Sequence, residues 1–232
     1  TDAYLQFVFI TGVTKFAQMG IFSTLNQLND ISFDLEYNAL CGMTCPEIEA
    51  TFAPELQALA AQTEATYDNV VEQLTRQYDG YRFTPSKGFA PIYNPFSVLS
   101  ALDKLRFGDY WFASGTPTFL VEILKKTDFD LRELDGIEVS SVSLSDDRAN
   151  IGNPVPMIYQ SGYLTIKDYD KRFGNYLLEF PNDEVRYGFM DFLVPYYTSV
   201  VDDERGFYLG KFVRELESGN VDAFLTRLQA FF

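Results

Sequence analysis

The sequence contains no histidine among its 232 residues. This absence excludes serine and cysteine nucleophiles that histidine activates, histidine general bases, and the usual ligand sets of zinc. Cysteine is almost as scarce, with Cys41 and Cys45 the two in the chain, and two thiols do not complete a structural metal site. We therefore predict no metal site, and we interpret both cysteines as reduced packing residues of a cytoplasmic protein rather than a redox or metal pair.

Basic residues are also few, 18 against 33 acidic residues, so the net charge is -15. A surface of this sign repels phosphate backbones at long range, which disfavours nucleic-acid binding by the surface as a whole. No apolar run has the length of a membrane span, so we expect no membrane contact. The sequence also lacks a G-x-x-x-x-G-K-[ST] phosphate loop and a strand ending in paired acids that would hold magnesium. We therefore predict no catalytic residue in these 232 residues alone.

The most informative stretch, residues 78–95, combines a helix stop, a strand start and a new helix start. Gly80 fits the left-handed position that ends a helix, because glycine adopts it without steric cost. Asn94 before Pro95 is the pattern of a helix N-cap with proline in the first turn. Arg82 lies between two aromatic residues in a strand-like segment and should point to the opposite face from both. The residues that we expect to build this junction are Tyr78, Asp79, Gly80, Tyr81, Phe83, Asn94 and Pro95.

Residues 78–83 (YDGYRF) and 93–95 (YNP) resemble the signature of the predicted AAA-ATPase-like proteins of gut and oral anaerobes. Proteins of that family usually carry a PD-(D/E)XK nuclease-like domain at the C-terminus. Further stretches match the family in the same order, and together they cover most of the chain. They are residues 10–16 (ITGVTKF), 41–44 (CGMT), 159–166 (YQSGYLTI) and 181–186 (PNDEVR).

The resemblance implies that the chain is the C-terminal portion of an ATPase region. The full protein would bind ATP and Mg²⁺ and couple them to a conformational change that reaches the nuclease-like domain. The partners of this chain would then be the missing N-terminal nucleotide-binding part and the absent C-terminal nuclease-like domain. No ATP or Mg²⁺ is expected to bind to this chain alone.

The resemblance also suggests nucleotide-sensing residues. Thr11 or Thr14 is similar to the polar residue that senses the γ-phosphate after a central strand, and Lys15 would add a cation there. Arg82 is similar to a second sensor that reaches a phosphate bidentately. Ordinary alternatives stay open: Thr11 in a strand-to-helix turn, and Thr14 as a helix cap. Arg82 would then be a structural clamp that pairs with Asp79 or a nearby glutamate.

We predict an α+β, mostly helical fold in four parts. These parts are a remnant of the ATPase core (residues 1–36), a helical lid with the junction (37–130), a linker and winged-helix-like module (131–205), and helices leading to an absent domain (206–232). The core remnant would supply strands at residues 4–10, a nearly unbroken apolar run, and 31–35, where apolar and polar residues alternate.

The winged-helix-like module rests on the order helix, hairpin, helix between residues 155 and 193, with an added edge strand at residues 140–144. The predicted phosphate contacts of this hairpin are Lys167, Lys171 and Arg172. Asp168, Asp170 and the net charge oppose such contacts. Two alternatives to the lid interpretation therefore stay open: a wing that binds nucleic acid, and a scaffold whose exposed aromatic side chains dock a partner or a second copy.

Overall fold

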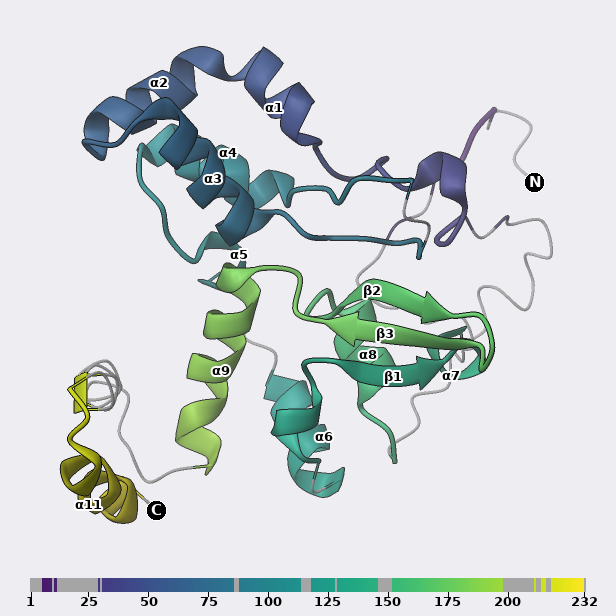
Figure 1. Ribbon diagram of the computed structural model, residues 1–232. Coiled ribbons are helices and arrows are strands. Elements are labelled where there is room, and N and C mark those ends of the chain that lie inside the picture. Colours follow the sequence, from purple (N-terminus) through teal and green to yellow (C-terminus); the bar gives the residue numbers. More distant parts are fainter. Residues whose placement is uncertain are drawn as a thin grey trace.

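The computed structural model describes residues 6–9, 11, 29, 31–85, 88–113, 118–127, 129–145, 152–197, 211, 214–215 and 218–231. Within these residues the fold is α+β and mostly helical, as the sequence predicted (Figure 1). The chain forms two packed units, of which the first is helical and the second combines helices with a three-stranded sheet. None of the described helices is long and apolar enough to cross a lipid bilayer.

The first packed unit is helical. Its elements are α1 (Cys45–Thr51), α2 (Ala53–Gln62), α3 (Tyr67–Tyr78), α4 (Pro95–Lys104) and α5 (Tyr110–Ala113). Local signals explain where these helices start: a carboxylate oxygen of Glu47 accepts the backbone N–H of Thr44 at 2.8 Å, which forms part of a capping box at the start of α1. Asn94 caps α4, because its Oδ1 accepts the backbone N–H groups of Phe96 at 3.0 Å and Ser97 at 3.4 Å. The shared core contains Leu56, Leu59, Val70, Leu74, Tyr78, Val98 and Ala101.

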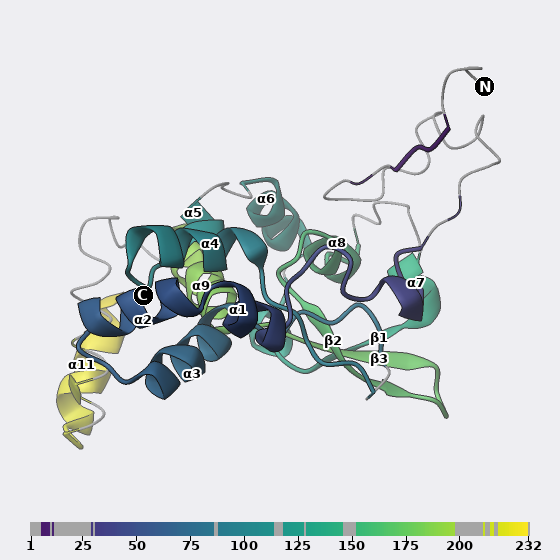
Figure 2. The same ribbon diagram turned by 90° about the horizontal axis from the view of Figure 1, so that it is seen from above.

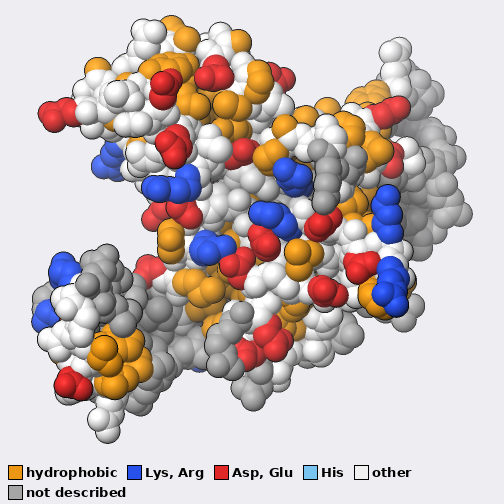
Figure 3. Space-filling model, viewed as in Figure 1, with side chains coloured by type: hydrophobic (Ala, Val, Ile, Leu, Met, Phe, Trp, Pro, Cys, Tyr) orange, Lys and Arg blue, Asp and Glu red, His pale blue; other side chains and the backbone are white. Residues whose placement is uncertain are grey.

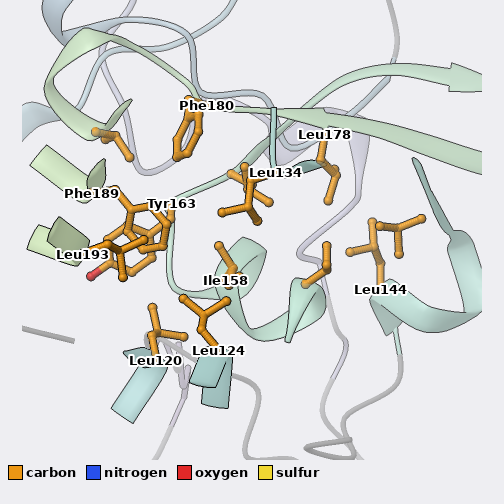
Figure 4. Packing of buried hydrophobic residues seen from close by; sticks show 14 of the residues in the cluster. Leu120, Leu124, Leu134, Leu144, Ile158, Tyr163, Leu178, Phe180, Phe189 and Leu193 are labelled. Atoms are coloured by element: carbon orange, nitrogen blue, oxygen red, sulfur yellow. The ribbon is translucent and has the colours of Figure 1, made fainter. Parts of the chain in front are cut away.

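The second packed unit is built on an antiparallel sheet with the strand order β1-β3-β2. Its elements are α6 (Thr118–Thr127), β1 (Ile137–Ser140), α7 (Ser141–Ser145), α8 (Val155–Gln160), β2 (Thr165–Asp170), β3 (Asn175–Glu179) and α9 (Asp183–Tyr197). In the register of the central strand, Tyr176 of β3 lies between Val139 of β1 and Tyr169 of β2. The core joins side chains of the helices and the sheet, including Leu120, Leu124, Leu144, Ile158, Leu178 and Phe189 (Figure 4).

Two smaller elements are 3₁₀ helices, Leu35–Tyr37 and Leu131–Glu133, and α11 (Val221–Phe231) is the last described helix. Figure 1 shows α11 apart from both packed units. The core packing also places α6 with the sheet, since Leu120, Val121 and Leu124 belong to the second core. The sequence grouped residues 118–127 with the helical lid instead. The two cores meet at α5, since Tyr110 belongs to the first core and Trp111 packs against the second.

The two strands expected in the core remnant are not formed by the described residues. Residues 31–35 make a turn that leads into the first 3₁₀ helix, where Asp34 donates its backbone N–H to the carbonyl of Ile31. The apolar Phe33 of this alternating stretch packs on the second unit, with its ring 6.5 Å from that of Tyr176, and does not lie in a sheet. Residues 6–9 form no strand either, because no described segment pairs with them, and the Phe7 side chain is 81% exposed.

The edge strand of the second unit lies earlier than predicted. Residues 137–140 form β1, while residues 141–144 of the expected strand lie in α7 (Ser141–Ser145). The chain leaves the sheet at Ser141, whose backbone N–H and Oγ both donate to the carbonyl of Gly174, at 3.1 and 2.8 Å. Ser141 is therefore bonded to the turn of the β2–β3 hairpin, and β1 ends at Ser140.

Candidate functional site

The junction between the two units is a loop that leaves α3 after Tyr78 and returns to α4 at Asn94. Its ends are joined because the backbone N–H of Asn94 donates to the carbonyl of Tyr78 at 3.0 Å. Beyond them, the backbone N–H groups of Tyr81 and Ile92 each donate to the carbonyl of the other, at 3.2 and 3.0 Å. The loop is therefore a short two-stranded ribbon, and Arg82 follows directly after its paired residue.

Gly80 allows the second unit to approach this ribbon closely. Its φ is +106°, and a Cβ placed there would overlap the carbonyl oxygen of Pro181. The next residue, Asn182, donates its side-chain Nδ2 to the carbonyl of Asp79 at 2.9 Å and accepts the backbone N–H of Val185 at 3.1 Å. Asn182 thus caps α9 and binds the end of α3 at the same time. Two stretches that carry the family resemblance, far apart in sequence, meet here.

The backbone of Arg82 is fixed to the start of β2. Its N–H donates to Oγ1 of Thr165 at 2.7 Å, while the Thr165 hydroxyl donates to the carbonyl of Arg82 at 3.0 Å. The backbone N–H of Ile166 donates to the same carbonyl at 3.4 Å. The Arg82 side chain is half-buried. Arg82 therefore connects the two units: its segment continues from α3 of the first unit, and its backbone is hydrogen-bonded to β2 of the second.

Asp79 is an acid held in a poorly solvated position beside Arg82. Burial raises the pKa of its carboxyl above the ordinary value of 3.8, while the backbone N–H of Gly80 and the charge of Arg82 act in the opposite direction. Its Oδ1 is buried and accepts no hydrogen bond within the described part of the chain. The charge of Arg82 thus partly offsets the cost of burying this carboxylate.

Glu184 is a buried residue of the junction that sequence reasoning missed. It is 2% exposed, its Oε2 accepts the hydroxyl of Ser97 on α4 at 2.7 Å, and its Oε1 accepts the backbone N–H of Trp111 on α5 at 2.8 Å. Burial raises the pKa of Glu184, and these hydrogen bonds, together with one from the backbone of Tyr110, oppose that rise. One carboxylate therefore joins α4, α5 and α9. An acid in the first turn of a helix ordinarily indicates an exposed side chain that complements the helix dipole, so the sequence carried no signal of burial.

Two tyrosines of the junction are also held by hydrogen bonds. The Tyr78 hydroxyl donates to the carbonyl of Gly108 at 2.9 Å and accepts the N–H of the same residue at 3.0 Å. The hydroxyls of Tyr93 and Thr75 lie 2.6 Å apart. Burial raises the pKa of both tyrosines well above its ordinary value. Neither phenol is therefore ionised near neutral pH, and both tie the ends of helices to neighbouring loops.

The predicted nucleotide-sensing residues are not brought together by the described residues. Thr11 is described and its side chain is exposed, whereas Thr14 and Lys15 lie outside the described residues. Of the four candidates, Arg82 is the one with described contacts at the junction. Among the described residues no group of three or more acidic or thiol side chains is placed to hold a metal ion.

The hairpin formed by β2 and β3 carries the predicted phosphate contacts, Lys167, Lys171 and Arg172. Lys167 forms an ion pair with Glu179 across the strands, with 3.0 Å between Nζ and Oε2. Asp170 Oδ1 accepts the backbone N–H groups of Arg172 at 2.7 Å and Phe173 at 3.3 Å, so its charge is directed into the turn. The guanidinium of Arg172 lies over the Phe173 ring, 4.9 Å from its centre. The end of the hairpin thus presents a cation stacked on an exposed aromatic ring.

Comparison with known proteins gives one informative relative. No family model and no solved structure matches the sequence. The chain is 36% identical over 189 residues to a bacterial protein described as "Uncharacterized protein in vnfD 5'region", from Azotobacter chroococcum mcd 1. The match covers 80% of this chain and 34% of that protein, so the chain spans about a third of the relative's length.

Proposed function

We propose that the chain is the lid and winged-helix-like part of an AAA-type ATP-binding protein, and that it couples the nucleotide state to an attached nuclease-like domain. In this proposal the nucleotide-binding part outside the chain supplies the phosphate loop and the ligands of Mg²⁺. This chain contributes Arg82 and the segment that contains Thr11, Thr14 and Lys15. The free thiols of Cys41 and Cys45 fit the cytoplasmic location that belongs to the same proposal.

The observation that carries the proposal is the position of Arg82. Its segment continues from α3, whereas its N–H and carbonyl are held by Thr165 of β2. A guanidinium that moves toward a phosphate therefore pulls on the sheet as well as on the helices. A sensor of nucleotide state needs such a connection, because a ligand shifts a conformational equilibrium through contacts that differ between the two states.

The polar contacts between the units support transmission of that movement over the whole chain. The Glu184 carboxylate joins α9 to α4 and α5 through two charge-assisted hydrogen bonds, which any separation of these helices would break. Asn182 and Pro181 add a second attachment at the end of α3. The two units are thus expected to respond as one body rather than to hinge at the junction.

The connectivity of the second unit supports its assignment as a winged-helix-like module. The chain runs from α6 through β1, α7 and α8 into the β2–β3 hairpin, and β1 pairs with β3. α8 has no basic residue and buries Val155 and Ile158 in the core. A short apolar helix of this kind favours a role in positioning neighbouring domains over a role in reading a nucleic acid.

The test is ATP binding and hydrolysis by the full-length protein, with Arg82→Ala, Arg82→Lys and Thr165→Val variants. We expect Arg82→Ala to lower hydrolysis by about 10²-fold, as the loss of one charge-stabilising donor does in other enzymes. Its thermal stability should fall only modestly, because the backbone anchors Arg82 and the guanidinium charge offsets only part of the cost of burying Asp79. Arg82→Lys keeps the charge and should recover part of the rate.

Thr165→Val removes the anchor and keeps the guanidinium. It should preserve ATP binding but weaken any dependence of nuclease activity on ATP. The proposal is wrong if the full-length protein binds no nucleotide. It also fails if Arg82→Ala merely unfolds the protein, since the junction would then be a structural clamp alone.

A further inference from the structure

The turn of the β2–β3 hairpin exposes a large aromatic side chain. Phe173 is 65% exposed, in a turn position where polar residues are the rule. Lys171 and Arg172 precede it, and the Arg172 guanidinium covers one face of its ring. We call residues 171–174 the hairpin tip. An exposed aromatic ring flanked by cations is the composition of an interface anchor.

The hairpin tip is held rigidly in place. The carbonyl of Gly174 accepts both the backbone N–H and the hydroxyl of Ser141, at 3.1 and 2.8 Å. The backbone N–H of Gly174 donates to the carbonyl of Asp170 at 2.8 Å, which closes the turn. Next to the hairpin tip, the paired Tyr169 and Tyr176 have their rings 4.7 Å apart. An anchor that is ordered before binding loses less conformational entropy when a partner docks on it.

The charge of the hairpin tip is opposite to that of the chain as a whole, which is -15. A nucleic acid would need a wider basic surface, but Lys167 is paired with Glu179 and α8 supplies no cation. An acidic protein surface with exposed apolar side chains fits the tip better. The chain itself has such a surface on α9.

Three neighbouring positions of α9 form that surface, which we call the α9 face. Tyr187 and Met190, one helical turn apart, are 62% and 37% exposed, and Asp191 is exposed beside them. In Figure 3 hydrophobic and charged side chains lie side by side over α9. The pKa of Asp109, next to α5, is raised by burial and further by the charge of Asp191. A cation placed between these two carboxylates would relieve their repulsion.

We infer that the chain associates with a second copy of itself, and that the hairpin tip of one copy docks on the α9 face of the other. Phe173 would pack on Tyr187 and Met190. Lys171 and Arg172 would lie beside Asp191 and Asp109 of the second copy. This inference is independent of nucleotide binding.

The contact must form between copies. In both Figure 1 and Figure 2 the end of the β2–β3 hairpin projects away from α9 of the same copy. Because two different surfaces meet, the assembly is either a dimer with two reciprocal contacts or a larger ring or filament. Because the hairpin tip is basic and the α9 face is acidic, we also expect salt to weaken the association.

The experiment is sedimentation velocity of the purified chain over a wide concentration series. The tip variants are Lys171→Glu with Arg172→Glu, and Phe173→Ser. The matched control is Lys125→Glu with Lys126→Glu, which makes the same charge change on exposed positions of α6. We expect both tip variants to raise the dissociation constant about tenfold or more, and the control to leave it within about twofold.

A charge exchange tests the partner surface. An Asp191→Lys variant should associate weakly by itself, yet an equimolar mixture with the Lys171→Glu, Arg172→Glu variant should associate again. The inference is overturned if the parent chain is monomeric at every concentration, if the tip variants associate as the parent does, or if the mixture stays monomeric. It is also overturned, in favour of nucleic-acid binding, if the chain stays monomeric and a labelled single-stranded DNA 30-mer binds it through the tip.

Discussion

The buried carboxylate of Glu184 makes the strongest prediction about stability. Replacement by alanine removes an acceptor that the Ser97 hydroxyl and the backbone N–H groups of Trp111 and Tyr110 share. The two backbone donors have no means of turning toward water, since Glu184 is 2% exposed and lies between helices. Each buried donor left without a partner costs about 1–3 kcal/mol. We therefore expect Glu184→Ala to lower the free energy of unfolding by about 3–5 kcal/mol.

Glutamine at the same position should cost far less. Its amide oxygen can still accept from the backbone of Trp111, and its NH₂ group can donate to the Ser97 oxygen, because a hydroxyl both donates and accepts. The variant loses the extra strength of charged hydrogen bonds, about 1 kcal/mol each. It also avoids burying a charge, which offsets that loss. The net change for Glu184→Gln is expected to stay within about 1 kcal/mol.

The assay is urea unfolding followed by tryptophan fluorescence, which reports on Trp111 directly. Asp183→Ala is the matched control: this neighbouring acid pairs with Arg76 at 3.1 Å, but the two side chains are 33% and 71% exposed. An exposed pair contributes about 0–1 kcal/mol. Equal losses for the alanine variants at positions 183 and 184 would refute the reasoning, as would a Glu184→Gln variant as unstable as Glu184→Ala.

The pH dependence of the same variants checks the protonation of Glu184. Because burial raises its pKa above the ordinary value of 4.5, the folded chain binds this proton more tightly than the unfolded chain. The contribution of Glu184 to stability is therefore largest below that value and falls as the pH rises through the folded pKa. Relative to Glu184→Gln, the parent should gain stability as the pH falls from neutral toward the ordinary value of 4.5. A parent that loses stability relative to the variant over this interval would contradict the raised pKa.

Two further variants test the backbone of the junction. Gly80→Ala should cost at least about 2 kcal/mol more than Gly136→Ala, because both glycines have positive φ but only the Cβ at position 80 meets the carbonyl of Pro181. Equal losses of melting temperature for the two variants would show that the positive φ, and not the close approach of Pro181, sets the cost of the substitution. Asn94→Ala should cost about 1 kcal/mol through loss of the α4 cap, and Asn94→Ser should recover most of it by keeping a capping oxygen. Identical melting temperatures for these two variants would contradict a capping role.

Local signals predicted the helical elements of the first unit well. The glycine stop at position 80 and the Asn94-Pro95 start each place a helix end within a residue or two. Such signals are reliable because the groups that satisfy a helix terminus come from residues three or four positions away. The β2–β3 hairpin was predicted for the same reason, since its turn is satisfied by Asp170 within the turn itself.

The contacts that define the junction were beyond sequence reasoning. Arg82 meets Thr165 across 83 positions, and Asn182 meets Asp79 across 103. No local pattern encodes which distant hydroxyl or amide will face a given carbonyl. The strand expected at residues 31–35 is absent for a related reason. The alternation of apolar and polar residues that suggested it includes Phe33, whose ring packs on the distant Tyr176 instead of lying in a sheet.

The residues at the junction divide into those that hold the backbone and those that do not. Thr165 and Asn182 bind main-chain groups of the ribbon and of the end of α3, and Glu184 binds main-chain groups of α5. Removing any one of them should therefore destabilise the chain. Arg82 differs, because Thr165 holds its main chain and its guanidinium makes none of these bonds; the guanidinium charge offsets part of the cost of burying Asp79. A side chain whose placement depends on this many contacts, but whose loss leaves them intact, is the one to substitute when function and folding must be separated.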